Sequence, residues 1–554
     1  MATTAAAGVG TLHGSLDTRG VWISFVLGAA AATLTWRTAR APHARITVAD
    51  TVLFIVFGLA SLRVFLWLLY PSGTEWKIQS PHNLGDIALH LNLINRWANG
   101  GKFWPDNPFL SGAAFAYHPG MDLWNAALRI GGVPLIEGLR WTGLLGAAAT
   151  AAALWRWGRG FALAAFLFAG GLGTIWALCA TGSLDPMQSE TAWKNVFLAM
   201  FVTQRGLLYA LPAGLVLMTV WRAQLDGHNG GPFLPPAVQV ALYASMPLFN
   251  APAFLFLSLH LAVCALSAWR RSPVRPFVAV GLASVIPATW LVHMVTAGFT
   301  AGGSLRFFPG WMQEDQGPVF WVWNFGVFLP LVALAGIGVF RRGATAGDRA
   351  AWLTGAATLA FSFLFLVAPW PWDNTKLILW GYLAVLPPVW QLVICERPAW
   401  LRGALCILLF ASGATSLAAG LSLPNGYRLA DRAELGGMQV MLRNMPVDAR
   451  LACAHEYNHP ALLLGQPLAM GYDGHLYSQG LDYSQVEHDL DTLMNGASGW
   501  RDAARRLETR YLFWGPREQA KWPRSTKPWI DCAVGIASAE GWKLYLLTPC
   551  LLED

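Results

Sequence analysis

The chain has 554 residues, of which 55% are hydrophobic and only 12% are charged. Soluble domains typically carry about 25% charged residues. The low charge and the long apolar runs therefore exclude a soluble protein for most of the chain and predict an integral membrane protein. The net charge of +7 does not indicate nucleic-acid binding, because the arginines cluster between apolar runs, where they act as membrane topology signals.

The apolar runs predict a bundle of about a dozen transmembrane helices. The N-terminal stretch MATTAAAGVGTLHG lacks the basic and apolar regions of a cleavable signal peptide, so we expect the first span to act as its own signal. A span needs about 20 apolar residues. Runs that approach this length lie near 21–37, 50–70, 139–156, 161–180, 206–222, 237–250, 253–268, 276–297, 319–340, 350–368, 377–395 and 402–421.

Two segments leave the predicted number of spans at about 11–13. The region 237–268 is interrupted by two prolines around Asn250, so it forms either two short helices or one kinked helix. The segment 119–137 is apolar but contains charged residues and glycines, and we expect it to lie at the interface or to re-enter the membrane.

Arginines between the predicted spans set the orientation. If the N-terminus lies outside, the short inside loops contain most of these arginines, as the positive-inside rule requires. The outside segments are then 71–138, 181–205, 298–318, 369–376 and 422–554. We expect a multi-pass protein of a bacterial inner membrane, with the long first loop 71–138 and the C-terminal residues in the periplasm.

The composition changes at Leu421, so we expect a transmembrane domain over 1–421 and a small α/β domain over 422–554. The predicted strands are Leu451–Ala454, Leu468–Tyr472, Tyr511–Trp514 and Trp542–Thr548, and the predicted helices are Asp431–Asn444, Tyr483–Asn495 and Trp500–Glu508. Among Cys453, Cys532 and Cys550, the pair Cys532–Cys550 is favoured as a disulfide if the domain faces an oxidising compartment.

The first outside loop contains the most informative polar residues. Asp86 and His90 are four residues apart and share one face of a helix, where they could serve as a general base and its partner. The alternative is an ordinary hydrogen-bonded loop helix. Other candidates in this loop are a secondary acid, Asp122, and the sugar or acceptor contacts Trp104, Tyr117 and His118.

Two later outside segments contain candidate phosphate ligands. Gln204 and Arg205 lie at the mouth of a span, where Arg205 either holds a phosphate through two donors or snorkels to lipid headgroups. Asn374 and Lys376 lie at the start of another span, where backbone N–H groups also favour anions; the alternative there is an aromatic-belt turn. The same segments contain the acids Asp185, Glu190 and Asp373 and the candidate sugar or acceptor contacts Trp370 and Trp372.

One face of the predicted protein thus carries a long first loop with an acid, basic residues at later span mouths and a soluble C-terminal domain. This layout resembles the GT-C superfamily of integral membrane glycosyltransferases. The resemblance implies transfer of a sugar from a polyprenyl-phosphate carrier to a hydroxyl on a glycan, lipid or protein. It also implies that Asp86 is the base, with His90 beside it, and that Arg205 and Lys376 hold the donor phosphate.

The sequence departs from many members of that superfamily in the first loop. Those members have adjacent acids there, whereas Asp86 stands between Gly85 and Ile87. No cofactor is therefore predicted firmly, and the sequence leaves open whether a divalent metal such as Mg²⁺ or Mn²⁺ takes part. The chemistry that we expect is a single displacement at the anomeric carbon with inversion.

A second interpretation belongs to another class, a non-catalytic membrane scaffold subunit or a lipid transporter. It explains the 29 tryptophans and the arginine-rich loops equally well. It gives Asp86, Arg205 and Lys376 no shared purpose. A glycosyltransferase requires these three side chains to line one cavity at the outer face, whereas a transporter requires a polar path through the bundle.

Overall fold

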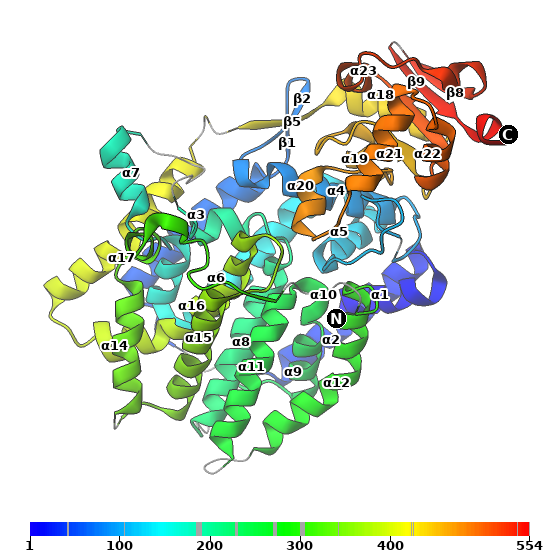
Figure 1. Ribbon diagram of the computed structural model, residues 1–554. Helices are drawn as coiled ribbons and strands as arrows, with labels where there is room; N and C mark the ends of the chain where they lie inside the picture. The colour runs from blue at the N-terminus through cyan, green and yellow to red at the C-terminus, as the bar shows by residue number, and fades with distance from the viewer. Residues whose placement is uncertain are drawn as a thin grey trace.

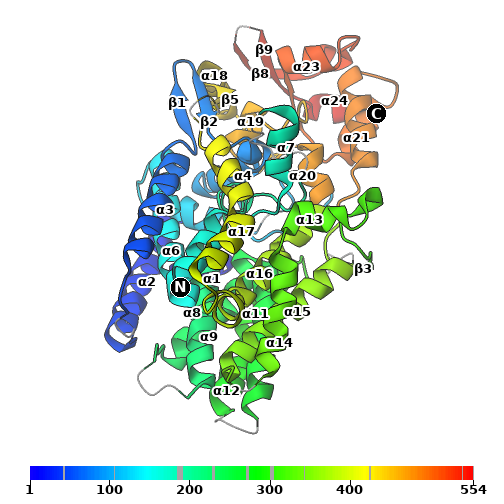
Figure 2. The ribbon, with the colours of Figure 1, turned by 90° about the vertical axis from the view of Figure 1, so that its left-hand side faces the viewer.

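The computed structural model describes residues 1–40, 44–104, 106–183, 191–227, 231–269, 274–299, 305–341, 343–422, 424, 426–539 and 541–552. A helical bundle forms one end of the molecule and the C-terminal domain covers the other end, with parts of the first long loop between them (Figure 1). A view turned by 90° shows the same arrangement (Figure 2). The predicted helical membrane bundle with a C-terminal α/β domain is confirmed.

The chain is mainly helical up to Gly420. Its helices are α1 (Ala2–His13), α2 (Thr18–Thr38), α3 (Val48–Leu66), α4 (Leu84–Ala98), α5 (Gly120–Ile130), α6 (Leu135–Leu167), α7 (Gly173–Thr181), α8 (Leu207–Leu225), α9 (Pro236–Ala244), α10 (Met246–Phe249), α11 (Ala251–Ala268), α12 (Arg275–Val295), α13 (Val319–Phe325), α14 (Phe328–Phe340), α15 (Ala346–Leu364), α16 (Thr375–Val389) and α17 (Ala399–Gly420). Its strands are β1 (Tyr70–Ser72), β2 (Glu75–Ile78), β3 (Arg306–Phe307) and β4 (Phe365–Leu366).

Six helical segments in the described residues are long and apolar enough to cross a membrane. They are Val48–Leu66, Leu207–Leu225, Ala251–Ala268, Arg275–Val295, Pro371–Ile394 and Ala399–Gly420. Helices α13 and α14 together would make a seventh span, but they are bent by 83° at a short break. Large apolar side chains of α12, such as Leu282 and Ile286, are exposed on the protein surface, as expected for residues that face lipid.

This count is lower than the predicted 11–13, and part of the difference comes from apolar runs that do not form single straight spans. The predicted spans 139–156 and 161–180 meet on α6, whose backbone leaves the helical conformation at Gly158 and Arg159. Hydropathy along the sequence detects apolar length but does not register such a break, since the neighbouring residues remain apolar.

The two ambiguous segments form short helices. The region 237–268 is divided among α9, α10 and α11, and the Asn250 side chain caps α11 by accepting a hydrogen bond from the Ala253 N–H at 2.8 Å. Within 119–137, α5 has 11 residues and is too short to cross a bilayer. It packs instead against α4, which belongs to the first loop.

Beyond α17 the chain forms a sheet with short helices around it. The strands are β5 (Tyr427–Asp431), β6 (Leu451–Ala452), β7 (Tyr511–Trp514), β8 (Val534–Ala539) and β9 (Trp542–Leu546). The last four form one sheet in the order β6-β7-β9-β8, with β6 and β7 parallel and the other pairs antiparallel. The helices are α18 (Arg432–Leu442), α19 (Pro460–Leu463), α20 (Asp473–Ser478), α21 (Ser484–Asn495), α22 (Trp500–Arg506), α23 (Pro516–Lys521) and α24 (Thr548–Leu552).

One predicted strand of this domain is wrong. The run Leu468–Tyr472 is not a strand of the domain's sheet, because its backbone bonds largely to the first loop. The Leu468 N–H donates to the Pro108 carbonyl at 2.9 Å, and the Gly471 N–H donates to the Phe109 carbonyl at 2.7 Å. The predicted disulfide Cys532–Cys550 is confirmed.

The first loop and the C-terminal domain share secondary structure. Strand β5 of the domain pairs antiparallel with β2 of the loop. Asparagines on α4 bind the domain as well: Asn92 donates to the Leu462 carbonyl at 2.8 Å, and Asn95 donates to the Leu463 carbonyl at 2.7 Å. These acceptors lie at the C-terminal end of α19, where a helix leaves backbone carbonyls unsatisfied.

A glycine permits the close approach of the domain to α4. Gly465 has a φ of +94°, and a Cβ built on it would lie 2.5 Å from the Arg96 backbone nitrogen. Only glycine fits both the left-handed conformation and the contact. The Arg96 guanidinium also bonds the Asp448 carboxylate at 2.6 Å. Helix α4 is therefore fixed from the domain side along its C-terminal half.

Candidate active site

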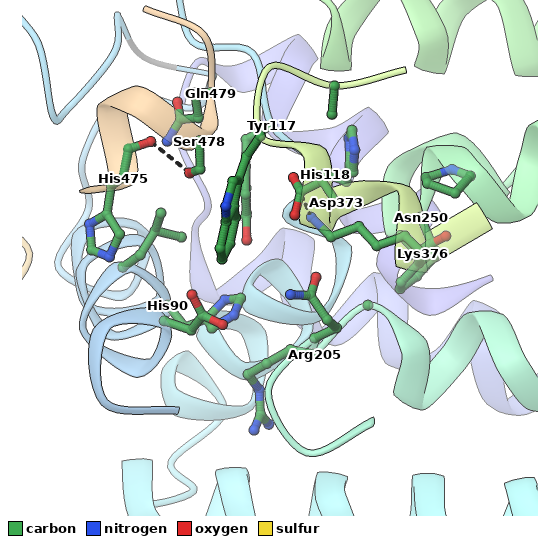
Figure 3. A pocket seen from close by; sticks show the side chains of 18 of the residues that line it. His90, Tyr117, His118, Arg205, Asn250, Asp373, Lys376, His475, Ser478 and Gln479 are labelled. Carbon is green, nitrogen blue, oxygen red and sulfur yellow. Dashed lines mark hydrogen bonds and ion pairs between the residues drawn. The ribbon is translucent and has the colours of Figure 1, made fainter. Parts of the chain in front are cut away.

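A cavity of about 590 Å³ lies where the bundle, the first loop and the C-terminal domain meet. Its polar side chains come from all three parts (Figure 3). The predicted site residues that line it are Asp86, His90, Tyr117, His118, Asp122, Gln204, Arg205, Trp370, Trp372, Asp373 and Lys376. The fold therefore gathers side chains that are nearly 300 residues apart in the sequence.

Asp86 lies in the first turn of α4 and faces this cavity. Burial raises the pKa of its carboxyl, while the charges of His90 and Lys376 act in the opposite direction. A carboxylate with a raised pKa is a stronger proton acceptor than a free one. The environment of Asp86 thus suits a general base.

His90, one helical turn after Asp86, is hydrogen-bonded to a different acid. Its Nδ1 lies 2.9 Å and 3.0 Å from the two carboxylate oxygens of Asp122, at the start of α5. A carboxylate only accepts hydrogen bonds, so Nδ1 carries the proton. The sequence predicted His90 as the partner of Asp86, and in the structure the side chain of His90 is hydrogen-bonded to Asp122.

Arg205 is a buried cation. It is 1% exposed, and its Nε, Nη1 and Nη2 atoms have no hydrogen-bond partner among the described residues. Burial lowers its pKa to about 10, and the charge of Asp122 opposes that shift, so the guanidinium stays protonated at neutral pH. Leaving a buried charge without hydrogen bonds is strongly unfavourable. This side chain therefore favours an anionic ligand.

The backbone around Arg205 is closely packed. It follows a π-helical turn, Phe197–Phe201, a feature that often occurs at functional sites. The next residue, Gly206, touches the α10 backbone, and a Cβ there would overlap the Phe249 carbonyl oxygen. Neighbouring packing thus fixes where Arg205 leaves the main chain.

Lys376 is a second cation in the cavity, and it is already paired. Its Nζ lies 3.0 Å from the Asp373 carboxylate one turn earlier. Trp372, between Trp370 and Asp373, donates from its indole nitrogen to the Ala192 carbonyl at 3.0 Å. This contact ties the corner that precedes α16 to the segment that leads to Arg205.

Tyr117 and His118 form an uncharged part of the wall. Their rings are stacked at an angle of 8° with centroids 6.0 Å apart. Burial and the charge of Lys376 lower the pKa of His118 to about 4, so its imidazole is neutral at physiological pH. Aromatic and neutral polar groups of this kind suit the hydroxyls and apolar faces of a sugar.

Four predicted site residues are not found in the cavity lining. The Asn374 amide bonds the backbone of Val367, Ser362 and Phe365, so it fixes a turn and has no free group for a phosphate. Trp104 packs between Phe103 and Phe115 in the first loop. Asp185 and Glu190 lie outside the described residues.

Several lining residues were not predicted. They are His82, Lys194, Asn250, Thr296, His475, Ser478 and Gln479. Lys194 follows the same rule as Arg205, a cation in an outside segment just before a span, and that rule would have identified it. His475, Ser478 and Gln479 lie in the C-terminal domain, about 390 residues from Asp86, and no sequence spacing connects them with the cavity.

Two acids of the cavity that could bind a metal ion are already paired with protein groups. In the cavity, Asp122 is engaged by His90 and Asp373 by Lys376. Among the described residues, the group of three side chains close enough to share an ion is Cys453, His459 and Glu518, in the core of the C-terminal domain. There the two Glu518 oxygens already accept backbone N–H groups, so this group fits a structural network better than an ion.

No protein-family model matches the chain, and no curated protein matches it by sequence. Among solved structures, the chain is similar to ArnT from Cupriavidus metallidurans bound to undecaprenyl phosphate, with 15% identity and a TM-score of 0.44 over 91% of this chain and 99% of ArnT. It is similar to the apo oligosaccharyltransferase of Archaeoglobus fulgidus, with 12% identity and a TM-score of 0.43 over 90% and 74% of the two chains.

A third similar structure is the mycobacterial arabinofuranosyltransferase AftD, with 15% identity and a TM-score of 0.49 over 92% of this chain and 40% of AftD. All three proteins are GT-C glycosyltransferases, the superfamily that the sequence resembles. At 12–15% identity, these likenesses concern the fold alone.

Proposed function

We propose that this chain is a membrane glycosyltransferase that moves a sugar from a polyprenyl-phosphate donor to a hydroxyl acceptor at the periplasmic face, with inversion. The observation that carries this proposal is Arg205, a buried guanidinium whose nitrogens have no hydrogen-bond partner among the described residues and which lines the same cavity as Asp86. A phosphate supplies the acceptors that this group lacks, and two parallel bonds match its geometry.

The proposed reaction is one displacement at the anomeric carbon. Asp86 takes the proton of the acceptor hydroxyl as its oxygen forms a bond to that carbon. The bond from the carbon to the donor phosphate oxygen breaks, and polyprenyl phosphate leaves with the electron pair. Arg205 and Lys376 stabilise the charge that develops on the leaving phosphate.

Two features support the proposed periplasmic orientation. The loop arginines predict that the cavity lies on the side opposite the basic inside loops. The Cys532–Cys550 disulfide fits an oxidising compartment. A periplasm-active reporter fused after Glu553 should therefore be active, and a cytoplasm-active reporter at the same position should be silent. The reverse result would place the cavity inside and contradict the orientation.

The alternative of a scaffold subunit or lipid transporter is less well supported. Asp86, Arg205 and Lys376 line one cavity, as the enzyme interpretation requires. The hydrogen-bonded pair of His90 on α4 and Asp122 on α5 lines the same cavity. A scaffold role does not require such a pair.

The proposal is tested in two steps with purified full-length protein. The first compares the thermal shift caused by decaprenyl phosphate with that caused by decaprenol, which has the same tail and no phosphate. A ligand that binds only the folded state raises the melting temperature. We expect a shift with the phosphate that is lost in Arg205→Ala. The second step measures sugar transfer from a panel of decaprenyl-phosphate sugars to methyl glycosides.

Equal shifts with decaprenyl phosphate and decaprenol would mean that the tail alone binds, and the phosphate site would be wrong. A phosphate-dependent shift without transfer from any sugar in the panel would support a lipid-binding scaffold or transporter instead.

A further inference from the structure

We propose that α20 of the C-terminal domain forms the acceptor subsite of this cavity and recognises a hydroxyl of a sugar or polyol through His475 and Gln479. This inference rests on the proposed function. Both side chains line the cavity, although α20 lies in the C-terminal domain rather than in the membrane bundle (Figure 3).

His475 presents a hydrogen-bond acceptor of fixed identity. It is 5% exposed, and its Nε2 lies 3.0 Å from the Gly85 carbonyl oxygen, which can only accept. The proton is therefore on Nε2, and Nδ1 carries the lone pair. Burial lowers the pKa of His475 to about 4, so the ring is uncharged at neutral pH. Nδ1 has no hydrogen-bond partner among the described residues.

Gln479 presents the complementary donor. It lies four residues after His475, directly after the last residue of α20, and it lines the same cavity. Its Nε2 is buried and has no hydrogen-bond partner in the described part of the chain. An amide nitrogen only donates. The subsite thus offers one acceptor and one donor.

This pair of atoms selects the chemistry of the ligand. Hydroxyl groups both donate and accept hydrogen bonds, so the hydroxyls of one carbohydrate can donate to His475 Nδ1 and accept from Gln479 Nε2. An ammonium group only donates and a carboxylate only accepts, so each leaves one buried atom without a partner. Leaving a buried polar atom unpaired discriminates strongly against the wrong ligand. The subsite therefore fits a carbohydrate or polyol better than an amine or an acid.

The position of α20 also fits the acceptor side of the reaction. Figure 3 shows His475, Ser478 and Gln479 on one side of the cavity and Lys376 on the other, with Tyr117 and His118 between them. In an inverting displacement the acceptor enters opposite the leaving group. If the phosphate lies near Lys376, the acceptor comes from the α20 side.

The base lies next to this subsite. Gly85, which receives the His475 hydrogen bond, directly precedes Asp86. One side chain of the domain therefore both contacts the first turn of α4 and lines the acceptor side. This arrangement brings an acceptor hydroxyl bound at α20 toward the carboxylate that is to deprotonate it.

Gln479→Ala is the decisive variant, because its amide nitrogen bonds no described protein atom and its removal should leave the fold intact. We expect the KM for a methyl glycoside acceptor to rise about tenfold, the loss of one hydrogen bond to a buried partner, while the thermal shift by decaprenyl phosphate stays at the wild-type value. Gln479→Glu should be at least as impaired, since a carboxylate cannot donate. Tyr477→Ala, on the exposed side of the same helix, is the matched control and should behave as wild type.

An active Gln479→Ala enzyme with an unchanged acceptor KM would overturn the subsite and leave the proposed function standing. A loss of the decaprenyl phosphate shift in Gln479→Ala would also overturn it, because the residue would then belong to the donor side. A wild-type protein that transfers no sugar from any donor of the panel would remove the proposed function and the subsite together.

Discussion

The membrane bundle and the C-terminal domain hold opposite sides of the cavity by different physical means. On the bundle side, close packing sets the backbone at Arg205, and Gly206 leaves no room for a side chain against Phe249. On the domain side, amide groups of Asn92 and Asn95 bond backbone carbonyls of the domain. Packing interactions are many and small, whereas each of these hydrogen bonds is a single directed contact.

This difference means that the two sides can be disturbed separately. Changes at Arg205 and Lys376 should act on donor binding, since both residues belong to the bundle side. Changes at α4 and its contacts should act on turnover, because α4 carries Asp86 and is attached to the domain. The predictions below separate these two effects, and they run from the largest expected change to the smallest.

The largest effect is expected at the base. Asp86→Asn is nearly isosteric and should lower turnover at least ~100-fold, the low end for loss of a general base. Donor binding, measured as the thermal shift by decaprenyl phosphate, should be retained. Burial raises the pKa of Asp86, so its ionised form costs stability at any pH above that pKa, and the variant should be as stable as the wild type or more stable. Near-normal turnover in the folded variant would show that another group is the base.

A smaller effect, on the donor instead of the turnover, is expected at Arg205. Arg205→Ala removes a charge-assisted contact worth roughly 1.5–3 kcal/mol, which corresponds to about a 10- to 150-fold loss of donor affinity. Arg205→Lys keeps the charge but not the paired donors, so its donor affinity should lie between those of the wild type and Arg205→Ala. Lys376→Ala should lower donor affinity less than Arg205→Ala does, because Asp373 already neutralises part of the charge of Lys376. Wild-type donor affinity in both alanine variants would identify these residues as interfacial anchors.

The pH dependence of turnover tests whether Asp86 is the base, because charge changes beside it should shift the pH profile in known directions. A base acts only when it is deprotonated, so turnover should fall about tenfold per pH unit below the pKa of Asp86. Burial raises that pKa, the charge of Lys376 lowers it, and the charge of Asp373 raises it. Lys376→Met should therefore shift the acidic limb to higher pH, and Asp373→Asn should shift it to lower pH. Shifts in the same direction would show that the limb does not report on Asp86.

The smallest effect is expected where α4 binds the domain. Asn92→Ala removes the hydrogen bonds that this buried amide donates to the Leu462 and Gln466 carbonyls and should destabilise the protein by about 1–3 kcal/mol. Turnover should fall a few-fold, and the thermal shift caused by decaprenyl phosphate should stay unchanged. Asn99→Ala is the matched control, because this exposed residue makes one longer bond, 3.3 Å to the Leu464 carbonyl, and should cost under ~0.5 kcal/mol. Equal effects at both positions would mean that the hydrogen bonds from Asn92 to the domain do not position α4.

Local composition by itself determined the membrane bundle and the boundary of the C-terminal domain. Apolar length and low charge predicted the membrane bundle, and the change at Leu421 marked the end of the last span within one residue of α17's end at Gly420. On the condition that the domain faces an oxidising compartment, the positions of the late cysteines favoured the Cys532–Cys550 pair, which the structure contains. Charged residues beside apolar runs drew attention to Asp86 and Arg205, because a charge near a membrane is costly wherever the chain folds.

The tertiary structure alone decided how these residues are paired. His90 bonds Asp122, 32 residues away, instead of the acid one turn before it. His475 contacts Gly85 across 390 residues, and this brings α20 into the cavity. Asn374 precedes the same helix as Lys376, but its amide oxygen and nitrogen both form hydrogen bonds to the backbone of a turn. Sequence patterns encode the cost of exposing or burying each residue, whereas hydrogen-bond partners depend on which distant segments the completed packing brings within about 3 Å.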